Sequence, residues 1–213
     1  MTRYLIVDDH AVVRRGVAEI IQETVTMEAT IDEASTGQEA LLKSYQNDYD
    51  LILLDISMPG SNGLEVLRDI KANKPDVPVL ILSMYPEDQY ALRAFTMGAA
   101  GYLNKYSAPG ELVSAIEQIE ASGKYVSPAA ALVLANAASR GRRQLSAPHE
   151  QLSNREMEVA CLIAGGKAVK QIAVELSLSV KTVNTHRSRL LKKLGLVGNV
   201  ELATYFLRNK LVT

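Results

Sequence analysis

The sequence contains a single cysteine, Cys161, which excludes an internal disulfide bond. Cys161 lies among apolar residues at helical spacing, so we interpret it as a small buried hydrophobic residue. Proteins without disulfide bonds are typical of a reducing compartment. We therefore expect a cytoplasmic protein.

Long apolar runs are also missing. No run approaches the ~20 apolar residues that a transmembrane helix needs, so we expect no membrane partner. Met1-Thr2-Arg3 leads directly into a strand-like segment, which does not resemble a secretory signal. Nothing matches a P-loop, which argues against an ATPase.

The chain has little net charge, formally −1, but the charge is unevenly distributed. Residues 1–125 contain 10 basic and 19 acidic residues, a balance of −9. Residues 126–213 contain 13 basic and 5 acidic residues, a balance of +8. An acidic half followed by a basic half predicts two domains, the second of which acts on a polyanion.

From residue 3 to about 122, short apolar runs alternate with longer segments of helical periodicity. This alternation predicts a parallel sheet covered by helices. Five strands and five helices indicate a flavodoxin-like, doubly wound α/β fold with strand order 2-1-3-4-5. Ligands of such sheets bind at the carboxyl ends of the strands.

Polar residues end or follow four of these apolar runs: Asp8 and Asp9, Asp55, Ser83 and Lys105. If the runs are adjacent parallel strands, these side chains meet at one edge of the sheet. Three carboxylates this close cannot all stay ionised without a cation, and Mg²⁺ prefers oxygen ligands. The simpler alternative is that Asp8-Asp9 only caps a helix.

The second half begins with a predicted linker over residues 126–151, which includes a short helix starting at Ser127-Pro128. Ser153 and Glu156 are spaced as a capping box at the start of a small all-α domain. A helix over about 180–194 follows a tight turn and is closed by Gly195. This arrangement predicts a helix-turn-helix unit, whose second helix can enter a major groove.

Helical spacing divides that second helix into two faces. Val183, Leu190, Leu191 and Leu194 are expected in the core. The opposite face carries Lys181, Asn184, Thr185 and Ser188.

These motifs resemble a known family. Asp8-Asp9, the segment Asp55-Ile56-Ser57-Met58-Pro59-Gly60, Ser83 and Lys105 resemble the receiver domain of bacterial two-component response regulators. Residues 152–211 resemble the LuxR-type helix-turn-helix domain, in Leu152-Ser153-Asn154-Arg155-Glu156, Gln171-Ile172-Ala173, Lys181-Thr182-Val183 and Lys192-Lys193-Leu194-Gly195. Together they are similar to the NarL/FixJ subfamily. The expected domains are a receiver over 1–125, the linker, and a DNA-binding domain over 152–213.

The resemblance implies that a partner sensor histidine kinase phosphorylates Asp55. Mg²⁺ (or Mn²⁺) would be bound by Asp8, Asp9, Asp55 and the backbone carbonyl of Ser57. The phosphoryl group would contact Lys105 and Ser83, and the Tyr102 ring would then turn inward as a switch. No enzymatic activity is expected beyond the chain's own phosphotransfer and dephosphorylation.

The resemblance also implies a homodimer that binds two half-sites of double-stranded DNA after activation. Asn184, Thr185 and Ser188 would reach base edges. Phosphate contacts would come from Lys170, Lys181, Thr182, Arg187, Arg189 and Lys192. Lys192 and Lys193 also suit the last turn of a helix for electrostatic reasons alone.

Two alternatives remain open. One is a regulator of the same architecture that works without phosphorylation. The other is a metal-dependent phosphatase, but such enzymes usually carry a second Asp where this sequence has Ser57. His10, His149 and His186 are too scattered to predict a metal site. Asn104 departs from the family pattern, which commonly has an apolar residue before the lysine.

Overall fold

The computed structural model describes residues 2–24, 29–58, 61–107, 109–140, 148–209 and 211–212. Pro59 and Gly60 of the Asp55 motif and residues 141–147 of the predicted linker lie outside the described residues. The chain divides into two compact units, Met1–Ser139 and Arg140–Thr213. Among the helices described, none is long and apolar enough to cross a membrane.

The first unit is built on a sheet of five parallel strands. They are β1 (Thr2–Val7), β2 (Ala29–Ala34), β3 (Leu51–Asp55), β6 (Val79–Ser83) and β7 (Gly101–Asn104), in the order β2-β1-β3-β6-β7. Counting these long strands alone, this is the predicted order 2-1-3-4-5, which is confirmed. Between β3 and β6 lies a short antiparallel pair, β4 (Ser57–Met58) with β5 (Ser61–Asn62).

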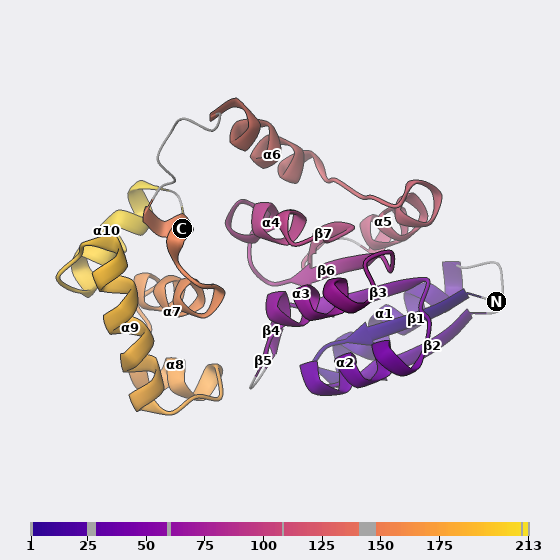
Figure 1. The fold of residues 1–213 in the computed structure, drawn as a ribbon, viewed down its shortest axis with the longest axis horizontal. Helices are drawn as coiled ribbons and strands as arrows, with labels where there is room; N and C mark the ends of the chain where they lie inside the picture. Colours follow the sequence, from indigo (N-terminus) through magenta and orange to yellow (C-terminus); the bar gives the residue numbers. More distant parts are fainter. Residues whose placement is uncertain are drawn as a thin grey trace. The chain divides into compact units, whose positions relative to one another are not determined.

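Five helices cover this sheet on both faces: α1 (Ala11–Thr24), α2 (Gly37–Gln46), α3 (Gly63–Asn73), α4 (Glu87–Thr96) and α5 (Pro109–Ser122). Helices α1 and α5 pack on one face, where Ile21 and Ile116 join the core, and α2 and α3 pack together on the other (Figure 1). Strands β3 and β6 are buried along their whole length because helices cover both of their faces. The carboxyl ends of the strands form the edge that remains accessible to a ligand.

Helix α6 (Pro128–Arg140) follows the last helix that covers the sheet, α5. Its N-terminus is capped by Ser127, whose hydroxyl accepts a hydrogen bond from the Ala130 amide at 3.0 Å. The same hydroxyl donates to the Glu87 carboxylate in the first turn of α4. The start of the predicted linker is therefore held against the first unit by side-chain hydrogen bonds.

The second unit consists of a 3₁₀ helix, Pro148–Gln151, and four α-helices: α7 (Asn154–Ala164), α8 (Val169–Glu175), α9 (Val180–Leu194) and α10 (Asn199–Arg208). The predicted capping box is confirmed, because Ser153 and Glu156 cap each other's backbone N–H groups. Gly195 ends α9 with a φ of 66°, a left-handed conformation that favours glycine.

The core of this unit forms around the inner face of α9. Val183, Leu190, Leu191 and Leu194 are all buried, as predicted from their helical spacing. Helix α9 packs against α7 and α8, and α10 packs against α7. The Arg155 side chain of α7 donates a hydrogen bond to the Leu176 carbonyl at 2.8 Å, which ties α7 to the turn between α8 and α9. This turn sets the orientation of α9 relative to α8.

Candidate functional site

The polar side chains predicted to converge in the first unit lie at the ends of adjacent strands. Asp8 follows β1, Asp55 ends β3, Ser83 ends β6 and Lys105 follows β7. Asp8 and Asp55 are each 1% exposed and Ser83 is fully buried. The parallel sheet therefore brings charged groups from distant parts of the sequence into one buried pocket.

Lys105 lies between two of the carboxylates. Its Nζ atom is 2.6 Å from Asp8 Oδ2 and 2.7 Å from Asp55 Oδ2. Burial raises the pKa of Asp55 to about 6, although the Lys105 ammonium opposes this shift. Burial also acts to lower the pKa of Lys105, but the two carboxylates outweigh it and raise that pKa. The pocket thus holds a charged lysine beside a carboxyl group that burial makes unusually basic.

The donor set of this pocket fits a divalent cation. Single ligand atoms of Asp8, Asp9, His10 and Asp55 all lie within 4.8 Å of one another. The buried Asp9 Oδ1 atom accepts no hydrogen bond from the described residues, although His10 Nδ1 lies 3.0 Å away. Three carboxylates against the Lys105 ammonium leave two negative charges, which one divalent ion would balance. Carboxylate oxygens are the ligands that Mg²⁺ and Mn²⁺ prefer.

His10 is a member of this cluster that the sequence did not predict. Its ring nitrogen lies 3.2 Å from Asp8 Oδ1, and its side chain is 60% exposed. The three histidines were not expected to form a metal site because they are far apart in the sequence. His10, however, lies beside carboxylates and not beside another histidine. Its position directly after Asp8-Asp9 was the available signal.

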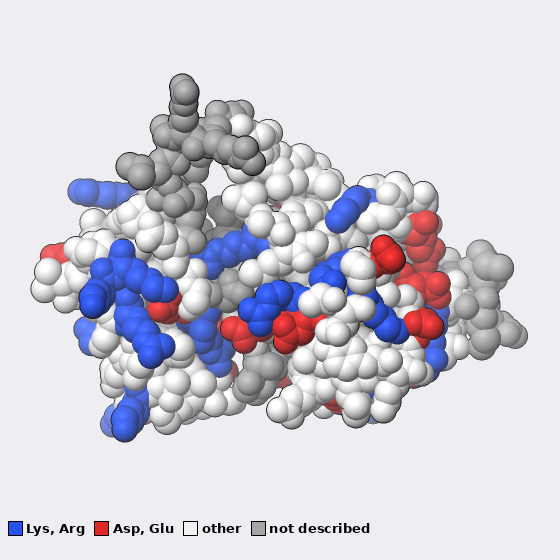
Figure 2. All heavy atoms as spheres, in the orientation of Figure 1, with Lys and Arg blue, Asp and Glu red and all other residues white. Residues whose placement is uncertain are grey.

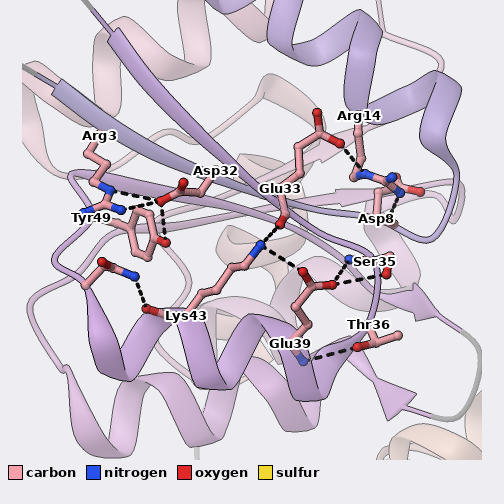
Figure 3. A network of polar contacts seen from close by, with 11 residues as sticks. Arg3, Asp8, Arg14, Asp32, Glu33, Ser35, Thr36, Glu39, Lys43 and Tyr49 are labelled. Carbon is pink, nitrogen blue, oxygen red and sulfur yellow. Dashed lines mark hydrogen bonds and ion pairs between the residues drawn. The ribbon is translucent and has the colours of Figure 1, made fainter.

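Arg14 is a second residue missed at the sequence level. Its guanidinium donates to the Asp8 carbonyl at 2.7 Å and to Glu33 at 2.6 Å, so it ties α1 to the ends of β1 and β2. Figure 3 shows Arg14 reaching both partners from α1. Next to Glu33 on β2, Asp32 accepts hydrogen bonds from Arg3 of β1 and from Tyr49 (Figure 3). Both sets of contacts hold β1 in place, and Asp8 and Asp9 directly follow this strand.

The chain around Asp55 is tightly packed. The Ser57 amide donates to Asp55 Oδ1 at 3.1 Å, which places Ser57 beside the carboxylate. Gly63, the first residue of α3, donates through its amide to the Ile56 carbonyl at 2.9 Å. A Cβ atom at Gly63 would lie only 2.1 Å from the Asp55 carbonyl oxygen. Only glycine allows this close approach of α3 to the end of β3.

Ser83 and Tyr102 both contact the loop between β6 and α4. The Ser83 hydroxyl accepts a hydrogen bond from the Tyr85 amide at 3.0 Å. Tyr102 is fully buried, and its hydroxyl donates to the Tyr85 carbonyl at 2.9 Å. Burial raises the pKa of the Tyr102 hydroxyl, which keeps it a neutral hydrogen-bond donor. In this structure the Tyr102 ring is therefore in the inward position.

The second unit presents a polar face on α9, the second helix of the helix-turn-helix. A shallow hollow on it is lined by Val180, Lys181, Asn184, Thr185, Ser188 and Arg189. All six are exposed. Figure 2 shows Lys and Arg side chains gathered over the helices of this unit, whereas acidic side chains in that view lie mainly on the first unit. A convex helix with a basic, polar surface suits the major groove of DNA.

Within the described part of the second unit, the remaining residues predicted to contact DNA are either simply exposed or take part in hydrogen bonds inside the domain. Lys170 on α8 and Lys192 on α9 are exposed. The half-buried Arg187 donates to Asn199 Oδ1 at 2.7 Å, which links α9 to the start of α10. Thr182 belongs to the cap of α9, where its amide donates to the Ser179 hydroxyl at 3.0 Å. The Thr185 hydroxyl donates to the Lys181 carbonyl at 2.9 Å.

Comparison with known proteins places both units in families. Residues 4–117 match the response regulator receiver domain, and residues 150–206 match the bacterial regulatory proteins of the luxR family. Response regulator GacA of Pseudomonas aeruginosa is 36% identical over 212 residues, which cover 100% of this chain and 98% of GacA. Response regulator UvrY of Escherichia coli (strain K12) is 36% identical over 211 residues, 99% of this chain and 96% of UvrY.

Solved structures of response regulators are also similar to this chain. A LuxR-family two-component response regulator from Aurantimonas sp. SI85-9A1 is 34% identical, with 65% of this chain and 99% of that chain covered and a TM-score of 0.59. RcsB from Salmonella enterica serovar Typhimurium, bound to promoter rprA in the presence of phosphomimetic BeF3-, is 23% identical. That likeness covers 96% of this chain and 98% of RcsB, has a TM-score of 0.62, and shows the fold alone. The chain therefore belongs to the two-component response regulators of the NarL/FixJ type, which join a receiver domain to a LuxR-type helix-turn-helix DNA-binding domain.

Proposed function

We propose that this transcription regulator is controlled by phosphorylation of Asp55, with a sensor histidine kinase as the phosphodonor. The observation that carries the proposal is the buried contact of Asp55 with Lys105, 2.7 Å apart, beside the carboxylates of Asp8 and Asp9. A carboxylate oxygen of Asp55 forms a bond to the phosphorus of a phosphohistidine while the N–P bond breaks. The electron pair of that bond stays on the imidazole nitrogen.

The protein contributes mainly position and charge to this transfer. Asp8, Asp9, Asp55 and the backbone carbonyl of Ser57 would hold Mg²⁺ (or Mn²⁺). The bound ion would offset negative charge on the carboxylates and on the transferred phosphoryl group. Lys105 pairs with one phosphoryl oxygen through a charge-assisted hydrogen bond. We propose no enzymatic activity beyond the chain's own phosphotransfer and dephosphorylation.

Ser83 and Tyr102 transmit the phosphorylated state. The Ser83 hydroxyl donates to a second phosphoryl oxygen, and this favours the conformation with Tyr102 inward. Phosphorylation shifts such an equilibrium only by its differential affinity for the two states. The favoured state presents the receiver surface through which two copies of the chain dimerise.

The dimer binds two half-sites of double-stranded DNA through its two copies of α9. Asn184, Thr185 and Ser188 contact base edges, because they are exposed on the outer face of that helix. Phosphates are contacted by Lys170, Lys181, Thr182, Arg187, Arg189 and Lys192. We place this activity in the cytoplasm, with DNA and the kinase as partners and no membrane contact.

The proposal is tested with acetyl phosphate and Mg²⁺ as the phosphodonor system. Wild-type protein should form an acyl phosphate on Asp55, detectable by mass spectrometry, then dimerise and bind a two-half-site duplex more tightly. Asp55→Asn should show none of these responses, whereas Asp76→Asn, which removes an exposed carboxylate, should respond like the wild type. Equal DNA binding by wild type and Asp55→Asn under all conditions would instead support a regulator that works without phosphorylation.

A further inference from the structure

Asn104 is the residue before Lys105, and its side chain organises the turn that carries the lysine. The Asn104 Oδ1 atom accepts a hydrogen bond from the Tyr106 amide at 2.8 Å. The Asn104 carbonyl accepts another from the Ser107 amide at 2.9 Å. These two bonds close a tight turn after β7, as Asn side chains commonly do. The Lys105 backbone lies inside this turn.

The other end of the same carboxamide reaches the neighbouring loop. Asn104 Nδ2 donates to the Tyr85 carbonyl oxygen, 3.4 Å away. That oxygen also accepts the hydrogen bond from the Tyr102 hydroxyl, at 2.9 Å. A carbonyl oxygen has two lone pairs, so it can accept from both donors at once. Asn104 and Tyr102 therefore stabilise the same position of the Tyr85 carbonyl.

The two loops joined in this way are the loops that hold the phosphoryl ligands. The Lys105 amide donates to the Ser83 carbonyl at 2.8 Å, which aligns the ends of β7 and β6. Asn104, one residue before Lys105, adds a side-chain link to Tyr85, two residues after Ser83. The backbone link aligns the strands, whereas the side-chain link holds the loop residue that the switch tyrosine contacts.

We propose that Asn104 is a positioning residue of the phosphorylation site, which holds the Tyr85 carbonyl where it accepts the Tyr102 hydroxyl and so favours the inward position of Tyr102. The inference rests on the proposed function of Asp55, Ser83 and Tyr102, and it adds a residue that differs from the usual apolar one. An apolar side chain at this position would leave the Tyr106 amide and one lone pair of the Tyr85 carbonyl without these partners. Losing one such hydrogen bond should change the ratio of inward to outward Tyr102 by about two- to tenfold.

Hydroxyl-radical footprinting of the full-length protein, read by mass spectrometry, tests this inference. Two variants are compared with the wild type in the absence of a phosphodonor. Asn104→Leu removes both side-chain hydrogen bonds, whereas Asn104→Ser can still accept from the Tyr106 amide but is too short to reach the Tyr85 carbonyl. Both variants should show a two- to tenfold increase in Tyr102 modification, and acetyl phosphate with Mg²⁺ should restore protection.

The chain supplies its own references for this measurement. Tyr4 is fully buried in the core and Tyr106 is 76% exposed, so neither should change between variants. If Asn104→Leu loosens the whole domain, Tyr4 modification also rises, and the comparison is then made with Asn104→Ser. If Tyr102 is modified to the same extent in Asn104→Ser as in the wild type, the inference is overturned. The hydrogen bond from Asn104 to the Tyr85 carbonyl would then not stabilise the inward position of Tyr102. Failure of the wild type to form an acyl phosphate on Asp55 is a separate result that overturns the proposed function instead.

Discussion

The Lys193 ammonium donates a hydrogen bond to the Glu156 carboxylate at 2.6 Å, which joins the last turn of α9 to the first turn of α7. The same carboxylate oxygen accepts from the Ser153 amide at 2.8 Å in the capping box. Burial acts to raise the pKa of Glu156, but Lys193 and Ser153 outweigh it and lower that pKa. Lys193 is itself 41% exposed, but its ammonium pairs with this buried carboxylate, whereas its exposed neighbour Lys192 makes no ion pair with the described residues.

This difference predicts opposite phenotypes for two adjacent lysines. Lys192→Ala should weaken binding to all duplexes alike and reduce the salt dependence of the affinity, with the slope falling in magnitude by about 0.9 for one lost phosphate contact. Lys193→Ala should leave that slope unchanged and lower the free energy of unfolding by roughly 1–3 kcal/mol, because the Glu156 charge loses its partner. Salt titrations of DNA affinity and urea denaturation measure the two effects.

The stability lost in Lys193→Ala should also depend on pH. The folded pKa of Glu156 is below its unfolded value, so the pair stabilises the protein above the unfolded pKa. This contribution is lost as the pH falls through the folded pKa. The difference between variant and wild type should therefore shrink on acidification below about pH 4.5. A difference that grows on acidification would contradict this assignment.

Asn184→Ala should relax sequence discrimination at one base position by about 1–3 kcal/mol, because an exposed Asn on α9 can read adenine with two hydrogen bonds. Lys181→Ala is the matched control, since a lost phosphate contact weakens specific and random duplexes to the same extent. Affinities for a set of single-base operator variants give the measurement. Equal losses of Asn184→Ala on operator and random duplex would show that Asn184 does not read a base.

Gly63→Ala should destabilise the receiver domain by roughly 1–3 kcal/mol, the usual cost of forcing an extra group into a packed site. The added Cβ would lie 2.1 Å from the Asp55 carbonyl oxygen, so the end of β3 must move and phosphorylation by acetyl phosphate should slow. Gly110→Ala in α5 is the control, because a Cβ there meets nothing within 4 Å. That variant should be as stable as wild type or slightly more stable, since Ala is the better helix former. Thermal unfolding and phosphorylation rates, measured for Gly63→Ala and Gly110→Ala, test this difference.

Asp55→Asn should stabilise the protein in metal-free buffer at pH 7.5 by roughly 1–3 kcal/mol. The pKa of Asp55 is raised to about 6 in the folded state, so ionising it costs stability as the pH rises from its unfolded value. Well below the unfolded pKa of 3.8 the carboxyl group is protonated in both states, and the gain of the variant should disappear. Added Mg²⁺ should stabilise the wild type more than the variant, because it would offset the same charge. Chemical denaturation across this pH range, with EDTA or Mg²⁺, measures both effects.

Much of this protein follows from local patterns in its sequence. The apolar runs before Asp8, Asp55 and Ser83 predict buried parallel strands, and parallel strands place their carboxyl ends at one edge. That is why the pocket could be predicted without coordinates. The inner and outer faces of α9 follow in the same way from helical periodicity, which is a property of a single helix.

Only the tertiary structure decided which polar side chains are paired. Lys192 and Lys193 are equivalent in the sequence, yet only Lys193 lies opposite Glu156, 37 residues away. Likewise, the proposed role of Asn104 depends on its hydrogen bond to the Tyr85 carbonyl on the neighbouring loop. Hydrogen bonds and ion pairs act over a few ångströms between segments far apart in the chain, so they depend on how the helices and loops pack. Periodicity determines which face of an element is buried, but packing determines which atoms meet there.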